Sequence, residues 1–304
     1  MRVAVIDLGT NTCNLLVAET ENGGFTILHQ SKQLVKLGDN RIRDNEISPE
    51  ATNRVLESFR VQKEIIENFG VNTVKVLATS AVRTASNKIR FLEQLSQNSG
   101  WTINVISGEM EAELIFKGVL LALKEFIEPS VILDIGGGSN ELILADKKEI
   151  SWKESQPSGM ARVINRFSLS DPIQLEEIKT LQKFFSEIHQ KAFSKCIEGK
   201  VKTLIGCSGA FDTIADIIDE VNPGEKQRTS QIIQPEEFNK VYHLLINSTR
   251  EERLNMKGMD FVRVDLIVPG VILIKHLISE IGIEQIFQTD FALREGVLFE
   301  MLKN

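Results

Sequence analysis

The chain of 304 residues is longer than one hydrophobic core usually spans, which predicts two domains of roughly 150 residues each. Its composition, 42% hydrophobic and 25% charged, is typical of a folded globular protein. The net charge of −7 argues against a duplex nucleic-acid binder, because such a protein needs a basic face to neutralise phosphates.

The compartment is predicted from what the sequence lacks. The N-terminus has no secretory-signal pattern, and the longest apolar stretches are shorter than a membrane span. Cys13, Cys196 and Cys207 are widely spaced and have no metal-ligand spacing, which indicates free thiols in a reducing environment. We therefore predict a cytoplasmic protein without a membrane partner.

The chain opens with an apolar strand at residues 3–6, followed by the turn Asp7-Leu8-Gly9-Thr10-Asn11-Thr12. Two more strands are predicted at residues 14–18 and 25–28, joined by the hairpin signal Asn22-Gly23-Gly24. Glycine permits the close backbone approach that a phosphate needs, and hydroxyl groups add hydrogen bonds. Thr10, Asn11 and Thr12 are therefore candidate phosphate ligands.

A cation follows the next predicted helix and strand. Ser48-Pro49-Glu50 favours a helix start, with Ser48 as N-cap, and this helix should run to about Gly70 before a strand at residues 74–78. Arg83 lies just past that strand and could clamp phosphate in bidentate fashion. The alternative is a solvated surface arginine.

A candidate catalytic carboxylate comes after the strand predicted at residues 103–106. Glu111 lies in Ser107-Gly108-Glu109-Met110-Glu111-Ala112-Glu113, at the first turn of a predicted helix. Hydrolysis of a phosphate chain requires a carboxylate that orients or deprotonates water. Acids in a first turn also favour the helix dipole, so a purely structural role is the alternative.

The second half repeats the opening pattern. A strand at residues 131–133 leads into Asp134-Ile135-Gly136-Gly137-Gly138-Ser139, and strands are predicted at residues 141–145 and 149–152. Either turn alone could be an ordinary turn. Their matched context predicts two phosphate-binding turns that face each other across a cleft, and it adds the candidate ligands Gly136, Gly137, Gly138, Ser139 and Asn140.

Carboxylates beside both turns are candidates for a metal site. Mg²⁺ takes hard oxygen ligands and neutralises phosphate charge. Asp134 and Glu141 flank the second turn, and Asp7 begins the first. We therefore predict Mg²⁺ as the cofactor.

A third turn follows the helix predicted from Asp171-Pro172-Ile173-Gln174, with Asp171 as its N-cap and Pro172 at its first position. A strand at residues 203–205 leads into Gly206-Cys207-Ser208-Gly209, ahead of a helix at residues 211–218. A turn at a helix N-terminus can bind anions, so Gly206, Ser208 and Gly209 are candidate phosphate ligands. The usual strand-to-helix turn is the alternative.

The remaining polar residues give weaker signals. Four basic residues could line the cleft wall or could lie in a solvated loop: Lys32, Lys36, Arg41 and Arg43. The histidines show no spacing suited to a metal site or a catalytic triad, so we interpret these four as surface or core residues: His29, His189, His243 and His276.

These blocks together resemble the exopolyphosphatase/guanosine pentaphosphate phosphohydrolase family, a branch of the actin, Hsp70 and sugar-kinase superfamily. The similarity covers nearly the whole chain and also includes Ala78-Thr79-Ser80-Ala81-Val82-Arg83 and Leu293-Arg294-Glu295-Gly296. It implies an α/β fold of two ribonuclease-H-like domains, residues 1–124 and 125–304, with an interdomain cleft and a last helix able to pack back on the first domain.

The resemblance also implies site roles and ligands. Glu111 would be the catalytic carboxylate, with Arg83 as its partner in catalysis and phosphate binding, and Asp134 and Glu141 would serve Mg²⁺. Polyphosphate or a guanosine penta- or tetraphosphate is the implied ligand, and a homodimer is one implied assembly. Longer members carry a further helical domain, so this chain is similar to a short form.

Two departures from the family pattern stand beside the turns. Asn14 replaces the more usual Arg or His, which removes a cation from the first phosphate turn. Asn140 replaces the common Thr after Gly-Gly-Gly-Ser, and its amide still offers hydrogen bonds, so we expect tuning of the site rather than loss of it.

The sequence thus predicts a Mg²⁺-dependent hydrolase that releases terminal phosphate from polyphosphate, guanosine pentaphosphate (pppGpp), or both. Two alternatives stay open. An ATP-dependent kinase or ATPase of the same fold would share both turns, although no sugar-site signature is evident. A non-catalytic regulator that binds polyphosphate or (p)ppGpp is favoured by Asn14 and opposed by Glu111.

Overall fold

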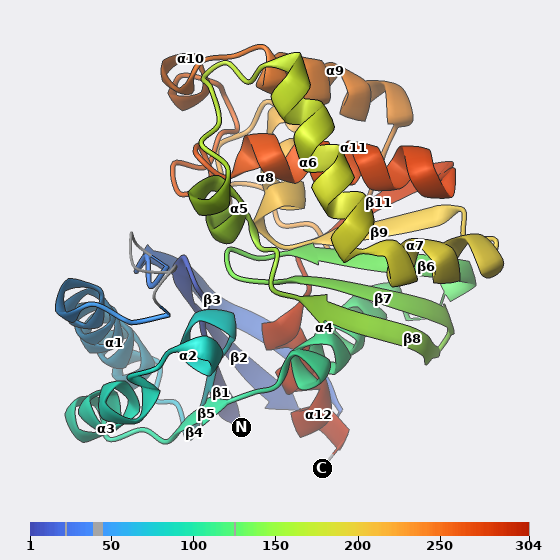
Figure 1. Cartoon of the computed structure of the whole chain (residues 1–304). Helices are drawn as coiled ribbons and strands as arrows, with labels where there is room; N and C mark the ends of the chain where they lie inside the picture. Colours follow the sequence, from blue (N-terminus) through green and yellow to red (C-terminus); the bar gives the residue numbers. More distant parts are fainter. Residues whose placement is uncertain (22, 39–44, 125, 304) are drawn as a thin grey trace.

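The computed structural model describes residues 1–21, 23–38, 45–124 and 126–303. It contains two mixed α/β sheets, each covered by helices, which lie one above the other in Figure 1. The first sheet has the order β3-β2-β1-β4-β5, with strands β1 (Arg2–Leu8), β2 (Thr12–Glu21), β3 (Gly24–Leu34), β4 (Thr73–Ala78) and β5 (Ile103–Val105). Its helices are α1 (Pro49–Asn68), α2 (Ser80–Thr84), α3 (Lys88–Ser99) and α4 (Gly108–Leu123).

The second sheet has the order β10-β11-β9-β6-β7-β8. Its strands are β6 (Phe126–Ile135), β7 (Asn140–Lys147), β8 (Glu149–Gln156), β9 (Thr203–Cys207), β10 (Gln231–Ile233) and β11 (Gln285–Thr289). The helices of this half are α5 (Met160–Arg166), α6 (Leu175–Ile188), α7 (Gln190–Glu198), α8 (Gly209–Asp219), α9 (Pro235–Ile246), α10 (Arg250–Leu254), α11 (Ile267–Ile281) and α12 (Leu293–Lys303).

The predicted repeat is present in the strand register. β1 pairs antiparallel with β2 and parallel with β4, and β6 pairs in the same way with β7 and β9. Asp7 lies opposite Asn14 on β2, just as Asp134 lies opposite Glu141 on β7. Asn14 and Glu141 therefore occupy equivalent positions in the two halves, and each faces the acid that begins its turn.

Local capping explains one correct helix start and one wrong one. Ser48 caps α1 by accepting a hydrogen bond from the Ala51 N–H, as predicted. The start predicted at Asp171 is wrong, because α6 begins at Leu175, where Gln174 and Glu177 form a capping box. The Asp171 carboxylate instead accepts hydrogen bonds from the backbone N–H of Arg250 and the guanidinium of Arg253.

The last helix lies against the first half of the chain. α12 packs along α4 and touches β1, and Figure 1 shows it in red beside α4. Glycine allows this close crossing. A Cβ on Gly118 of α4 would lie 1.9 Å from the Ala292 carbonyl oxygen, and one on Gly296 of α12 would lie 1.8 Å from the Leu114 carbonyl oxygen.

We expect Gly118→Ala to lower the free energy of unfolding by about 1–3 kcal/mol, the usual effect of overpacking a tight contact. The measurement is denaturant or thermal unfolding of the purified variant. Gly270→Ala is the matched control, because this α11 glycine has its nearest neighbours at 3.8 and 3.9 Å from the added Cβ. Equal stability of the Gly118 variant and the parent would contradict so close a helix crossing.

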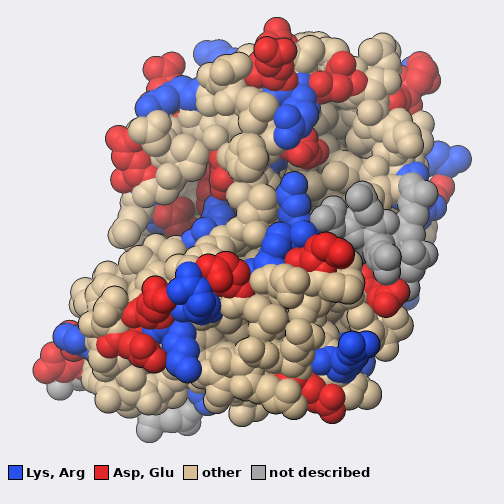
Figure 2. All heavy atoms as spheres, turned by 90° about the vertical axis from the view of Figure 1, so that its left-hand side faces the viewer, with Lys and Arg blue, Asp and Glu red and all other residues tan. Residues whose placement is uncertain are grey.

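Among the described residues, the buried apolar side chains form three clusters, and charged side chains are spread over the surface. Each sheet packs against its own cluster of buried apolar residues, and a third cluster around α4, α12 and the facing sides of both sheets joins the two halves. Acidic and basic side chains are both spread over the face drawn in Figure 2. In the part of the chain that the structure describes, no helix is long and apolar enough to cross a bilayer.

Candidate active site

A cavity lies between the two sheets, at the carboxyl ends of β1, β6 and β9. The second and third predicted turns meet here because β6 and β9 are parallel neighbours that end at the same edge of the second sheet, and the first turn follows β1 of the other sheet. Thirteen of the predicted site residues line this cavity, namely Asp7, Thr10, Asn11, Thr12, Glu111, Asp134, Gly136, Gly137, Gly138, Ser139, Glu141, Ser208 and Gly209.

The first and second turns share one backbone pattern. Gly9 N–H donates to the Thr12 carbonyl at 2.9 Å, and Gly136 N–H donates to the Ser139 carbonyl at 3.0 Å. A Cβ on Gly136 would lie 2.7 Å from that same carbonyl oxygen, so a side chain would disrupt the turn. The repeated tight turn explains why glycine stands at both positions.

The carbonyls of both turns are bound from behind. Backbone N–H groups of Val35, Lys36 and Gly38 donate to the carbonyls of Thr10 and Asn11. Met160 and Ala161 N–H donate to the Gly136 and Gly137 carbonyls, and the Arg162 guanidinium donates to Gly138. Within the described residues, the N–H groups of Thr10, Asn11, Gly137, Gly138 and Ser139 have no acceptor. Backbone donors of this kind form anion-binding nests.

Glu111 lies at the first turn of α4, where Ser107 caps the helix. The glutamate side chain is nearly buried, and its carboxylate accepts a hydrogen bond from the Arg83 guanidinium at 2.9 Å. Burial raises the pKa of Glu111 to about 7, while the Arg83 charge opposes this rise. Such a carboxylate can accept a proton near neutral pH.

Three more carboxylates surround the cavity. Asp134 accepts a hydrogen bond from the Ser208 hydroxyl at 2.7 Å, and Glu141 accepts one from the Ser155 hydroxyl at 2.6 Å. Burial raises the pKa of Asp134 to about 7, and burial also raises the pKa of Glu141 and of Asp7. Anionic carboxylates at this density are costly without a cation, so the donor set fits a divalent metal.

The match to the sequence model of the Ppx/GppA phosphatase family spans residues 16–304. The chain belongs to this family. A crystal structure of an exopolyphosphatase from Cytophaga hutchinsonii superposes with a TM-score of 0.95 at 34% identity, over 100% of this chain and 98% of that one. The Aquifex aeolicus member of the Ppx/GppA family gives a TM-score of 0.83 at 26% identity, with 100% and 98% covered.

A curated relative extends the comparison. Exopolyphosphatase 2 of Mycobacterium tuberculosis is 27% identical over 99% of this chain and 98% of its own length. The two-domain actin-like fold predicted from sequence is confirmed by these Ppx/GppA structures and by the two mixed sheets.

Three predicted residues of this Ppx/GppA protein lie outside the cavity lining. Arg83 contacts Glu111 and the Ile106 carbonyl, so its link to the cavity is through the Glu111 carboxylate. Asn140 is fully buried and donates to Ser158, which corrects the prediction that its side chain binds phosphate. Gly206 is likewise corrected, because the Phe211 ring occupies the space beside it, 2.0 Å from where a Cβ would be.

Two cations of the cavity were missed by the sequence analysis. Arg263 precedes α11, and its guanidinium lies over Gly209, where a Cβ would come within 2.3 Å of Nε. Its buried Nε has no hydrogen-bond partner among the described residues. Arg294 lies in the first turn of α12 and lines the cavity, and its charge opposes the rise that burial causes in the pKa of Asp7. The Leu293-Arg294-Glu295-Gly296 block could have drawn attention to Arg294, but no local pattern signalled Arg263.

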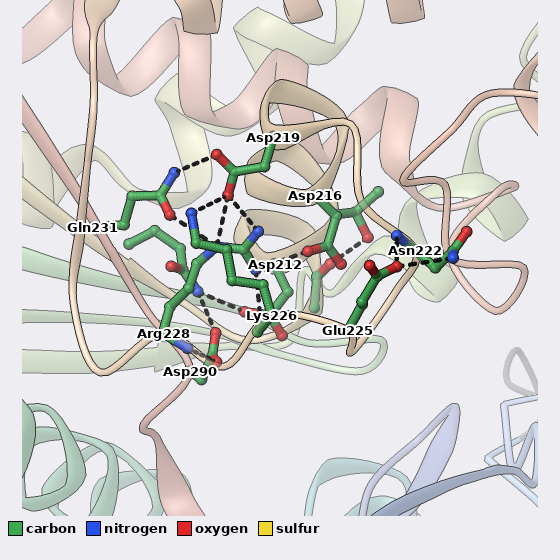
Figure 3. A network of polar contacts seen from close by, with 12 residues as sticks. Asp212, Asp216, Asp219, Asn222, Glu225, Lys226, Arg228, Gln231 and Asp290 are labelled. Carbon is green, nitrogen blue, oxygen red and sulfur yellow. Dashed lines mark hydrogen bonds and ion pairs between the residues drawn. The ribbon is translucent and has the colours of Figure 1, made fainter.

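Two aspartates that line the cavity are labelled in Figure 3 and form an acidic wall. These are Asp212 of α8 and Asp290 after β11, and both accept hydrogen bonds from the Gln288 amide. Burial, with the Asp212 charge, raises the pKa of Asp290 to about 6. Arg228 lies behind this wall and pairs with Asp216 at 2.7 Å.

The four basic residues predicted for the cleft wall do not lie together in the structure. Lys32 lines the cavity and forms an ion pair with Asp260 at 2.6 Å, which joins the two halves. Lys36 lines a neighbouring hollow that shares Asn11 with the cavity. The other two, Arg41 and Arg43, lie outside the described residues.

Proposed function

We propose that this protein is a Mg²⁺-dependent phosphohydrolase that releases the terminal phosphate from inorganic polyphosphate, from pppGpp, or from both. The observation that carries the proposal is the pair of matched turns, whose free N–H groups line one cavity with buried Glu111. The relatives named as exopolyphosphatases support a polyphosphate substrate. Because the chain is acidic overall, phosphate has to be held by local donors such as these N–H groups and the basic side chains of the cavity.

Orphaned polar atoms of the cavity fit an anionic ligand. The Thr10 hydroxyl and the Arg263 Nε are buried and have no partner in the part of the chain that the structure describes, and both residues line the cavity. A buried donor without an acceptor is costly, so a phosphate oxygen that accepts from it would remove this cost. The terminal phosphoryl group would lie between the two turns, with its non-bridging oxygens on the backbone donors.

Glu111 would accept a proton from the attacking water while the phosphoanhydride bond breaks. The water oxygen becomes part of the released orthophosphate, and the shortened chain leaves with the bridging oxygen of the broken bond. Arg83 would keep the Glu111 carboxylate in place through its 2.9 Å hydrogen bond. Backbone N–H groups of the turns would stabilise the charge on the transferring phosphoryl oxygens.

Of the carboxylates Asp134, Glu141 and Asp7, one or two would bind Mg²⁺ directly in the same cavity. When bound, the ion would neutralise phosphate charge and polarise the phosphoryl group. In the described part of the chain, no three acidic, histidine or cysteine side chains are arranged to hold a metal by themselves. This agrees with Mg²⁺ chemistry, because the ion usually keeps several waters and takes one or two carboxylates together with substrate oxygens.

Phosphate release from purified protein with Mg²⁺ tests the proposal, with polyphosphate, pppGpp and ATP as separate substrates. We expect release from polyphosphate or pppGpp and little from ATP. Binding of these ligands without any release would favour the regulator. Release confined to ATP would favour an ATPase of the same fold.

Arg83→Ala is expected to lower kcat/KM by about 10²-fold or more, because Glu111 loses the group that orients it and stabilises its charge. Steady-state phosphate release over a substrate series measures the change. Arg90→Ala, on the neighbouring helix α3, is the control and should behave like the parent. An unchanged kcat/KM for the Arg83 variant would show that Arg83 is a solvated surface arginine without a role in the reaction.

A further inference from the structure

A buried chain of polar groups lies behind the second turn. The Asn140 amide donates to the Ser158 carbonyl at 2.7 Å and to the Ser158 hydroxyl at 3.1 Å. The Ser158 hydroxyl lies 3.3 Å from Nε2 of His189, and Nδ1 of His189 lies 2.8 Å from the Glu154 carboxylate. Because a carboxylate only accepts, Nδ1–H donates to Glu154, and Nε2 accepts a hydrogen bond from the Ser158 hydroxyl.

This Ser-His-Glu arrangement has the hydrogen bonds of a nucleophilic triad but not its access to substrate. Ser158 is 1% exposed, His189 is 0% exposed, and neither residue lines the cavity. The Ser158 hydroxyl is also engaged by Asn140 and His189. A serine nucleophile must reach the reacting phosphorus atom, so a positioning role fits these residues better than a chemical one.

This buried chain of polar groups contacts the second turn at two places. Asn140 directly follows the turn in sequence. Ser158 directly precedes the segment whose N–H groups bind the carbonyls of the turn. In that segment, the N–H groups of Met160 and Ala161 donate to the Gly136 and Gly137 carbonyls at 3.0 and 2.9 Å. A Cβ at Gly159 would lie 2.4 Å from the Gly138 nitrogen, so this segment lies flat against the turn.

We infer that His189 is a positioning residue that fixes the second phosphate turn from behind. Glu154 orients the His189 ring through a hydrogen bond, and the ring in turn orients the Ser158 hydroxyl. Ser158 then holds Asn140 and the start of the segment that binds the turn carbonyls. The peptide planes of the turn are thereby held with their carbonyls turned back and their N–H groups free for phosphate. This inference rests on the proposed function, because it assigns the turn to phosphate binding.

The first test uses a matched pair of buried histidines. His276 is 7% exposed, and its Nε2 lies 2.6 Å from the Ser186 hydroxyl, but it lies on α11 and lines neither this turn nor the cavity. We expect His189→Phe to lower kcat at least tenfold and to change KM less than threefold. His276→Phe should keep kcat within twofold of the parent. Equal losses of kcat in the two variants would overturn the inference.

A conservative variant keeps the test valid if His189→Phe does not fold. His189→Gln places an amide oxygen where Nε2 accepts the Ser158 hydrogen bond, so it should recover kcat to within about threefold of the parent. A folded His189→Gln protein with the same loss as His189→Phe would show that the Ser158 contact does not matter, and this would overturn the inference.

Amide hydrogen exchange provides a readout that does not depend on hydrolysis. Exchange at Met160 and Ala161 reports directly on the bonds to the turn carbonyls. It should accelerate at least tenfold in His189→Phe and stay unchanged in His276→Phe. Unchanged exchange in both variants would overturn the positioning role, even if phosphate were released. If the parent released no phosphate but exchange still accelerated in His189→Phe, the positioning role would hold and the proposed function would be wrong.

Discussion

Glu111→Gln is expected to lower phosphate release by about 10²–10⁴-fold while substrate binding stays within a few fold of the parent. Glutamine keeps the shape of the side chain but cannot accept the proton of the attacking water. It also keeps an oxygen that can accept the Arg83 hydrogen bond. Single-turnover phosphate release and equilibrium binding of polyphosphate measure the two quantities separately.

The control for this variant is Glu109→Gln. Glu109 lies in the same first turn of α4, but its side chain is exposed and away from the cavity lining. It has the same interaction with the helix dipole and should leave turnover near that of the parent. Turnover of Glu111→Gln within tenfold of the parent would remove Glu111 from the mechanism.

The same residue predicts how activity depends on pH. Glu111 works as a base in its carboxylate form, and burial raises its pKa to about 7. The carboxylate fraction therefore falls as the pH drops below about 7, and kcat/KM should fall with it. A profile measured between pH 5 and 9, at saturating Mg²⁺, tests this direction. A rate that rises on acidification would require a different base.

Removal of Mg²⁺ is expected to have the other large effect, with phosphate release falling at least 10²-fold in excess EDTA and returning when Mg²⁺ is added. Asp134→Asn should raise the Mg²⁺ concentration needed for half-maximal activity, because the amide is a weaker ligand than a carboxylate. Asp146→Asn, an exposed acid at the end of β7, is the control. Full activity in excess EDTA would exclude a Mg²⁺-dependent mechanism.

The buried carboxylates of the proposed metal site also predict how the stability of the metal-free protein depends on pH. Folding raises the pKa of Asp134 from 3.8 to about 7, so its ionisation favours the unfolded chain, and the destabilisation grows as pH rises from about 4 to 7. Asp134→Asn should therefore raise the Tm of the metal-free protein at pH 8. Mg²⁺ should raise the Tm of the parent more than that of the variant, because a ligand stabilises the state that binds it. Calorimetry with and without EDTA checks both signs.

Sequence patterns were sufficient where the determining interactions are local. Ser48 and Pro49 start α1 because capping needs only the residues of one turn. The two acid-glycine turns could be recognised because each follows a strand directly, and a tight turn requires glycine whatever surrounds it. Glu111 could be proposed for the same reason, since its place at a helix start is set by Ser107 and the strand before it.

The tertiary structure decided everything that depends on contacts between distant segments. Asn140 and Glu141 are neighbours in sequence, yet strand alternation sends Asn140 to Ser158 and Glu141 to the cavity. Arg263 reaches Gly209 only because α11 packs beside α8. The sequence alone thus determined the two acid-glycine turns through local backbone chemistry, and it determined the fold class through its resemblance to a family. Only long-range packing decided which side chains face the cavity and which, like His189, hold it from behind.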